Sequence, residues 1–129
     1  MNRDQAIKII RKYIESQFPR SCYNCGQTYQ NLFEYLIKTK HLGGPIAYDE
    51  DELKVDQQNP TGVASYANCV CGSTLAITTQ SMHLVTYWRL IFWAKIESKK
   101  QKISVNELLL QIRQTIDDQV LNENPAVTS

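Results

Sequence analysis

Apolar residues recur at three- and four-residue intervals in two stretches of the first third of the chain, which is the spacing of helices that bury one face. The first stretch, at 6–18, predicts a helix with Asn2 as its N-cap and Pro19 as its stop. The second predicts a helix that includes 29–37 and ends at the Gly-Gly-Pro sequence of 43–45. We expect the first helix to pack on the core rather than lie on a membrane, because acidic residues dilute its basic face.

Two more helices are predicted in the last third of the chain. Residues 84–96 are apolar almost all round, and a run of about 10–14 such residues is typical of a buried helix rather than a membrane span. The last helix begins at Ser104, which is placed to form a capping box with Glu107. Its apolar stripe has four-residue spacing and consists of Leu108, Ile112, Ile116 and Val120.

The segment between these pairs of helices has short strand patterns and turn signals. Strands are predicted at 53–55, 63–66 and 73–79, with a turn at 59–62. We therefore expect an α+β fold that is mainly helical and has a small antiparallel strand unit.

The composition fits one domain with a hydrophobic core, because 43% of the 129 residues are hydrophobic. We expect this domain to span 1–121 and residues 122–129 to form a flexible tail. The 14 Lys and Arg against 13 Asp and Glu leave a net charge of +1, which disfavours nucleic-acid binding driven by net charge. The sequence has no apolar run long enough for a membrane span and no signal-peptide pattern, so we expect a cytoplasmic protein.

Four cysteines in two close pairs carry the clearest chemical signal. Cys22 and Cys25 stand in CYNCG, Cys69 and Cys71 stand in CVCG, and each pair is followed by a glycine. A tight turn of this kind directs two sulfur atoms at one ion, and glycine permits its backbone geometry. Two such knuckles supply four thiolates, which fill the tetrahedral coordination of Zn²⁺ and leave no open position for catalysis. The pattern therefore predicts a structural zinc site on the strand unit.

The two knuckles resemble those of zinc-ribbon and other treble-clef-like zinc-binding domains. The resemblance implies that Cys22, Cys25, Cys69 and Cys71 are the metal ligands. It covers only the knuckles and the strands beside them. The 43 residues between Cys25 and Cys69 exceed the spacing of about 15–20 residues in compact sites. The resemblance therefore indicates a kind of metal site and does not identify a particular function.

Other chemistry of the cysteines stays open at the level of the sequence. Four cysteines can also hold an iron–sulfur cluster, as in an electron carrier, and oxidation of the thiolates with loss of zinc would suit a redox sensor. Independent thiols are a further alternative. Disulfides are disfavoured because the sequence has no secretory signal and each pair is too close for an unstrained bridge. His41, expected near the end of the second helix, and His83 lack knuckle spacing, and we assign them no metal role.

An aromatic cluster in the third predicted helix is a second candidate site. Tryptophan, tyrosine and arginine anchor many protein interfaces, so a partner-binding surface is predicted from Tyr87, Trp88, Arg89, Phe92 and Trp93. Core packing is the alternative for the same residues. Aromatic residues beside basic ones would also suit nucleic acid.

The sequence has no recognisable catalytic motif, so we expect a binding protein rather than an enzyme. Our interpretation is a small regulatory or adaptor protein that binds another protein and has a structural zinc site. A redox- or metal-responsive sensor and a nucleic-acid-binding zinc-ribbon regulator are the alternatives. Self-association into a homodimer is a further option.

Overall fold

The computed structural model describes residues 1–41, 46–49, 54–55, 62–78 and 82–123. The helices are α1 (Arg3–Glu15), α2 (Leu32–Lys38), α3 (Leu84–Gln101) and α4 (Val105–Asn122). The strands are β1 (Arg20–Ser21), β2 (Thr28–Tyr29), β3 (Lys40–His41), β4 (Ile46–Asp49), β5 (Lys54–Val55), β6 (Gly62–Asn68) and β7 (Thr74–Thr78). Every strand pair among them is antiparallel, which confirms the predicted α+β class.

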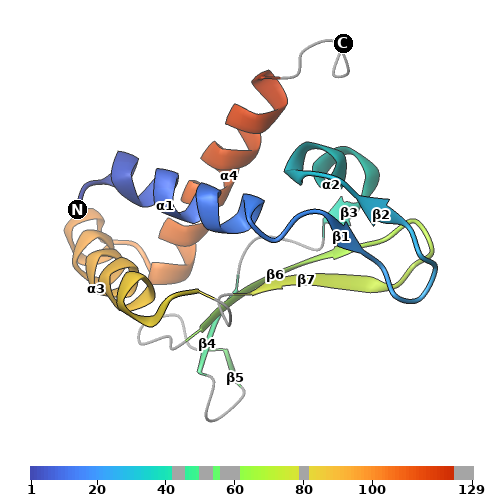
Figure 1. The fold of residues 1–129 in the computed structure, drawn as a ribbon. Coiled ribbons are helices and arrows are strands. Elements are labelled where there is room, and N and C mark those ends of the chain that lie inside the picture. The colour runs from blue at the N-terminus through green and yellow to red at the C-terminus, as the bar shows by residue number, and fades with distance from the viewer. Residues whose placement is uncertain (42–45, 50–53, 56–61, 79–81, 124–129) are drawn as a thin grey trace.

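Most of the helices lie at one end of the molecule, and the hairpins lie at the other. Figure 1 shows α1, α3 and α4 gathered at one end, and the β1–β2 and β6–β7 hairpins beside α2 at the other. Within the described ranges, none of the helices combines the length and the apolar character needed to cross a bilayer.

The first and last helices begin at the caps that the sequence predicts. The Asn2 Oδ1 accepts a hydrogen bond of 2.9 Å from the Gln5 N–H, and the Gln5 side chain accepts one from the Asn2 N–H, which completes a capping box. The Ser104 hydroxyl accepts a hydrogen bond of 3.0 Å from the Glu107 N–H at the start of α4. α1 ends at Glu15, earlier than predicted, and α4 continues to Asn122.

The second helix differs from its prediction at both ends. Asn31 is its N-cap, and Tyr29 belongs to β2 rather than to the helix. The backbone becomes extended at Thr39 and passes directly into β3, because the chain there pairs with β6. His41 therefore lies in a strand opposite Ala67, and its predicted place near a helix end is wrong. The Gly-Gly-Pro sequence predicted to end the helix lies outside the described residues.

β6 is the central strand of the larger sheet. β7 pairs along one edge of β6, with Asn68 opposite Thr74 next to the connecting turn. β3 and β4 pair with successive parts of the other edge, and β5 pairs with β4. The strands predicted at 53–55, 63–66 and 73–79 correspond to β5, β6 and β7, whereas the sequence did not predict β1 to β4. The predicted turn at 59–62 lies almost entirely outside the described residues.

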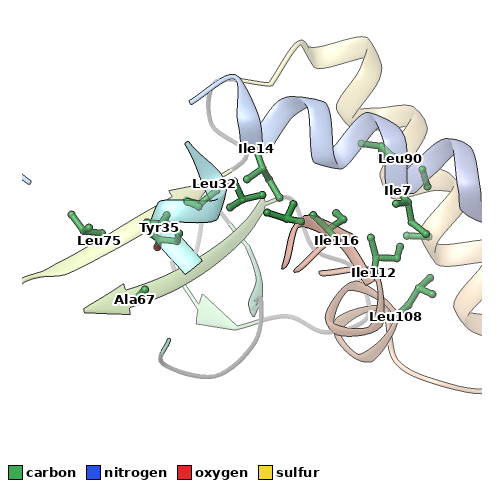
Figure 2. Close-up of a cluster of buried hydrophobic side chains, with 14 of the residues drawn as sticks. Ile7, Ile14, Leu32, Tyr35, Ala67, Leu75, Leu90, Leu108, Ile112 and Ile116 are labelled. Carbon is green, nitrogen blue, oxygen red and sulfur yellow. The ribbon is translucent and has the colours of Figure 1, made fainter. Parts of the chain in front are cut away.

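A continuous hydrophobic core joins the helices to the sheet. Figure 2 shows it running from Ala67 and Leu75 on β6 and β7, past Tyr35 of α2, to Ile116 and Ile112 of α4. α4 packs against α1, α2 and α3, and its predicted stripe is buried along its whole length. At the surface, Arg11 of α1 pairs with Glu123 after the end of α4 and also binds Glu15. These contacts make α4 the element on which the other helices assemble.

Candidate metal centre

The fold brings the two cysteine pairs together at one place. All four Sγ atoms lie within 4.8 Å of one another. The closest pairs connect different knuckles: Cys22 Sγ is 3.8 Å from Cys71 Sγ, and Cys25 Sγ is 3.6 Å from Cys69 Sγ. Among the residues that the structure describes, this is the one cluster of histidine, cysteine or carboxylate side chains arranged to hold a metal ion.

The first knuckle is the turn between β1 and β2. The Cys22 N–H donates to the carbonyl oxygen of Gln27 at 2.9 Å, and the Gly26 N–H donates to the carbonyl oxygen of Cys22 at 2.7 Å. Gly26 has a φ of +80°, which a residue with a side chain rarely adopts. The glycine after the cysteine pair therefore lets the chain turn back into β2.

The second knuckle repeats this design between β6 and β7. The Cys69 N–H donates to the carbonyl oxygen of Ser73 at 2.8 Å, and the Gly72 N–H donates to the carbonyl oxygen of Cys69 at 2.9 Å. Gly72 has a φ of +92°. One residue separates the two cysteines of this turn, whereas two residues separate those of the first knuckle. Each of its two hydrogen bonds likewise joins residues that are one position closer in the sequence. Both cysteine pairs are therefore held by equivalent backbone turns on antiparallel hairpins.

Each knuckle contributes one buried and one exposed cysteine. Cys22 and Cys69 are only 2% and 3% exposed and belong to the hydrophobic core, whereas Cys25 and Cys71 are exposed. The cluster thus lies at the edge of the core, with two sulfur atoms anchored in it and two facing outward.

Three further side chains hydrogen-bond to the sulfur atoms. The buried Tyr29 hydroxyl donates to Cys69 Sγ at 3.0 Å, and the Asn24 amide donates to Cys71 Sγ at 3.6 Å. Ser73 also hydrogen-bonds to Cys71. Partners of this kind orient metal ligands and partly balance thiolate charge. Asn24 lies inside the first knuckle motif and Ser73 directly follows the second, so their contact with the sulfur atoms could have been predicted from the sequence. No sequence signal connects Tyr29 with a cysteine 40 residues away.

The surroundings of three of the thiols shift their pKa values in opposite directions. The side chain and the backbone of Ser73 lower the pKa of Cys71 to about 5, and the Tyr29 hydroxyl lowers the pKa of Cys69. A backbone N–H acts to lower the pKa of Cys25, but desolvation and the neighbouring thiols outweigh it and raise that pKa to about 12. These three thiols therefore differ in how readily they lose their protons, and a divalent cation bound at the cluster would displace the protons that remain.

The sulfur positions fit a single tetrahedral ion. A zinc–sulfur bond of about 2.3 Å and tetrahedral angles place neighbouring sulfur atoms about 3.8 Å apart. The two closest pairs, at 3.6 Å and 3.8 Å, agree with this spacing. Four thiolates around one ion leave no coordination position for water or substrate, as in structural sites. His83 lies elsewhere, exposed at the N-terminus of α3.

The aromatic cluster predicted as a partner surface is divided between the two sides of α3. Tyr87 and Trp93 are buried in the protein interior. Trp88 and Phe92 are 50% and 68% exposed, and Arg89 is also exposed. Core packing therefore describes the first two residues, and only the other three remain on an accessible surface.

Comparisons with family models, curated proteins and solved structures return no match for this chain. The zinc-ribbon resemblance thus rests on the two knuckles alone, and the function has to be inferred from the geometry of the molecule.

Proposed function

We propose that this protein is a small binding module, clamped by a structural zinc ion, that docks a partner protein on the exposed side of α3. The regulatory or adaptor role expected from the sequence belongs to this proposal. The observation that carries it is a row of five apolar side chains that the fold leaves uncovered.

The sulfur geometry supports zinc over an iron–sulfur cluster. A cluster places more than one iron between the thiolates and so needs a wider cage of sulfur atoms than a single ion does. Here the four sulfur atoms lie within 4.8 Å of one another, which suits one ion. Such an ion would tie the β1–β2 hairpin to the β6–β7 hairpin and add folding free energy in a region of short strands.

The uncovered row follows α3 from Leu84 to Ile96. The row begins with an adjacent leucine and valine, and a tryptophan, a phenylalanine and an isoleucine follow at three- and four-residue intervals. All five side chains are between 42% and 68% exposed. We call this the outer face of α3, and it consists of Leu84, Val85, Trp88, Phe92 and Ile96. Single exposed apolar residues are ordinary, but a contiguous row with two large aromatic rings is typical of an interaction surface.

The charges around the outer face indicate what kind of partner it takes. At 3.6 residues per turn, Lys95 borders the row on one side, Arg89 and Lys100 border it on the other, and Lys99 extends it by one turn. The only acidic residue of α3 is Glu97. A partner segment with apolar residues flanked by acidic ones would be complementary. A second copy of α3 would place basic groups opposite basic groups, which disfavours a homodimer through this face.

A peptide-display selection on the metal-loaded protein tests the docking proposal. We expect the selected peptides to combine apolar and acidic residues, and to lose binding to the Phe92→Ser variant. Leu110→Ser is the matched control, because Leu110 is an exposed apolar residue on α4, and this variant should bind as the wild type does. Peptides that bind Phe92→Ser unchanged would contradict the proposal. A dimer that Phe92→Ser dissociates would instead assign the face to self-association.

Redox sensing is a second candidate, favoured by the exposure of Cys25 and Cys71. An oxidant in solution would reach these two sulfur atoms without unfolding the protein. Release of the metal by mild hydrogen peroxide, together with altered peptide binding, would support this function. Retention of the metal under the same treatment would contradict redox sensing and would leave the metal with a structural role only.

A further inference from the structure

An apolar cavity of about 80 Å³, open to solvent on one side, lies at the helical end of the molecule, away from the cysteine cluster. α1, α3 and α4 form most of its wall, and the end of β7 completes it. Its wall includes the buried side chains of Ile14, Ile77, Leu90, Ala94 and Ile112. Concave apolar sites of this kind, beside a close-packed core, are where small ligands bind proteins.

The wall presents almost only apolar surface to the cavity. The Tyr13 hydroxyl donates to the carbonyl oxygen of Thr78 at 2.7 Å. The Arg113 guanidinium donates to the carboxylate of Asp117 at 3.0 Å, so its charge is compensated. Water is stable in a cavity only when it finds two to four polar partners. The chemistry of this wall therefore favours a neutral molecule that needs no hydrogen bonds.

We propose that this cavity binds a small neutral apolar molecule, either a single hydrocarbon ring or a short alkyl chain. A closed apolar cavity of about 150 Å³ lined by leucine, isoleucine and phenylalanine binds benzene. The cavity here also presents a mainly apolar surface, but it is open on one side and has about half that volume. The part of the ligand that lies inside the cavity is therefore no larger than one ring. Ile10, Tyr13, Met82 and Leu109 are partly exposed wall residues, and they form the side from which a chain extends to solvent.

This site is independent of the proposed docking function. The cavity adjoins the buried side of α3, through Leu90 and Ala94, whereas the outer face lies on the opposite side of the same helix. It shares no residue with the cysteine cluster. Loss of peptide docking and loss of ligand binding would therefore be separate results.

Benzene and n-pentane, as ring and chain probes, test the proposal on the metal-loaded protein. We expect at least one probe to shift the methyl resonances of Ile14, Leu90 and Ile112. At a probe concentration of ten times Kd, the folding equilibrium constant should rise about 11-fold, which raises Tm by about 3–6 °C. Ala94→Leu, which fills the cavity, should abolish both effects. Should Ala94→Leu fail to melt cooperatively, Ile10→Phe fills the cavity from its open side.

Phe92→Ser is the control for binding at the surface, because it removes a ring from the outer face and leaves the cavity intact. This variant should keep the full response to the probe. The proposal is overturned if neither probe shifts those resonances at saturation, or if the folded cavity-filling variant responds as the wild type does. It is also overturned if Phe92→Ser abolishes the response, since the probe would then sit on the outer face.

Discussion

Removing the hydroxyl of Tyr29 should weaken metal binding without disturbing the packing of its ring. The Tyr29 ring is completely buried and meets the ring of Tyr35 edge-on, with centroids 6.0 Å apart. Phenylalanine retains this ring contact. The Tyr29→Phe substitution therefore deletes one interaction selectively, the hydrogen bond of 3.0 Å from the hydroxyl to Cys69 Sγ.

The expected magnitude follows from the charge on the sulfur atom. In the metal-bound protein Cys69 is a thiolate, and a hydrogen bond to a charged group contributes about 1.5–3 kcal/mol. Loss of a hydrogen bond to a metal ligand typically lowers metal affinity by about 10–100-fold. We therefore expect Tyr29→Phe to raise the Kd for Zn²⁺ by about 10–100-fold, which corresponds to about 1.4–2.7 kcal/mol.

Competition with a chromogenic chelator measures this change, and Tyr23→Phe is the matched control. Tyr23 adjoins Cys22 in the same knuckle, but its side chain is fully exposed, so its substitution should leave the Kd within about twofold of the wild type. In metal-free protein we expect the loss of unfolding free energy in Tyr29→Phe to be about 0.5–1.5 kcal/mol, the usual net contribution of one hydrogen bond. Equal Kd values for Tyr29→Phe and the wild type would refute the reasoning.

Three further substitutions test the core, a helix cap and a surface ion pair. Trp93→Ala should lower the free energy of unfolding by about 3–5 kcal/mol because it empties a buried site. Phe92→Ala, on the exposed side of α3, should change this free energy by less than about 0.5 kcal/mol. Equal losses for the two variants in urea denaturation would contradict the division of α3 into two sides. Ser104→Ala should cost about 1 kcal/mol in the same assay through loss of the N-cap of α4, and an unchanged midpoint would show that the cap is dispensable. The hydrogen bond from Arg11 lowers the pKa of Glu123, so this ion pair stabilises the protein above the ordinary carboxyl pKa and is lost as pH falls through the lowered one. The Tm values of Glu123→Gln and the wild type should therefore differ at neutral pH and converge in acid, and a difference that is independent of pH would contradict this.

The features predicted correctly from the sequence are those fixed by neighbouring residues. Asn2 and Ser104 start their helices because a capping side chain needs only the backbone of the next turn. The knuckles are predictable for the same reason, since a cysteine pair followed by a glycine defines its own turn. Asn31 carries a comparable signal, an asparagine three residues before Glu34, which marks the true start of α2. The apolar spacing that continues back to Tyr29 obscured it.

The features that the sequence did not reveal depend on contacts between distant segments. β3 and β4 are short strands that exist because the edge of β6 is available for pairing. The Tyr29 hydroxyl reaches Cys69 only once the two hairpins lie together. In α3 the apolar residues surround the whole helix, so their spacing cannot distinguish the buried Trp93 from the exposed Phe92. Only the packing of α1 and α4 against one side of α3 separates them.

X-ray absorption on metal-loaded protein from native cells tests the shared metal site most directly, because it reports the identity of the bound metal and its ligands together. We expect one zinc per chain, surrounded by four sulfur atoms at about 2.3 Å. Iron neighbours at short range, or a zinc shell with fewer than four sulfur atoms, would contradict a single ion that joins the β1–β2 and β6–β7 hairpins.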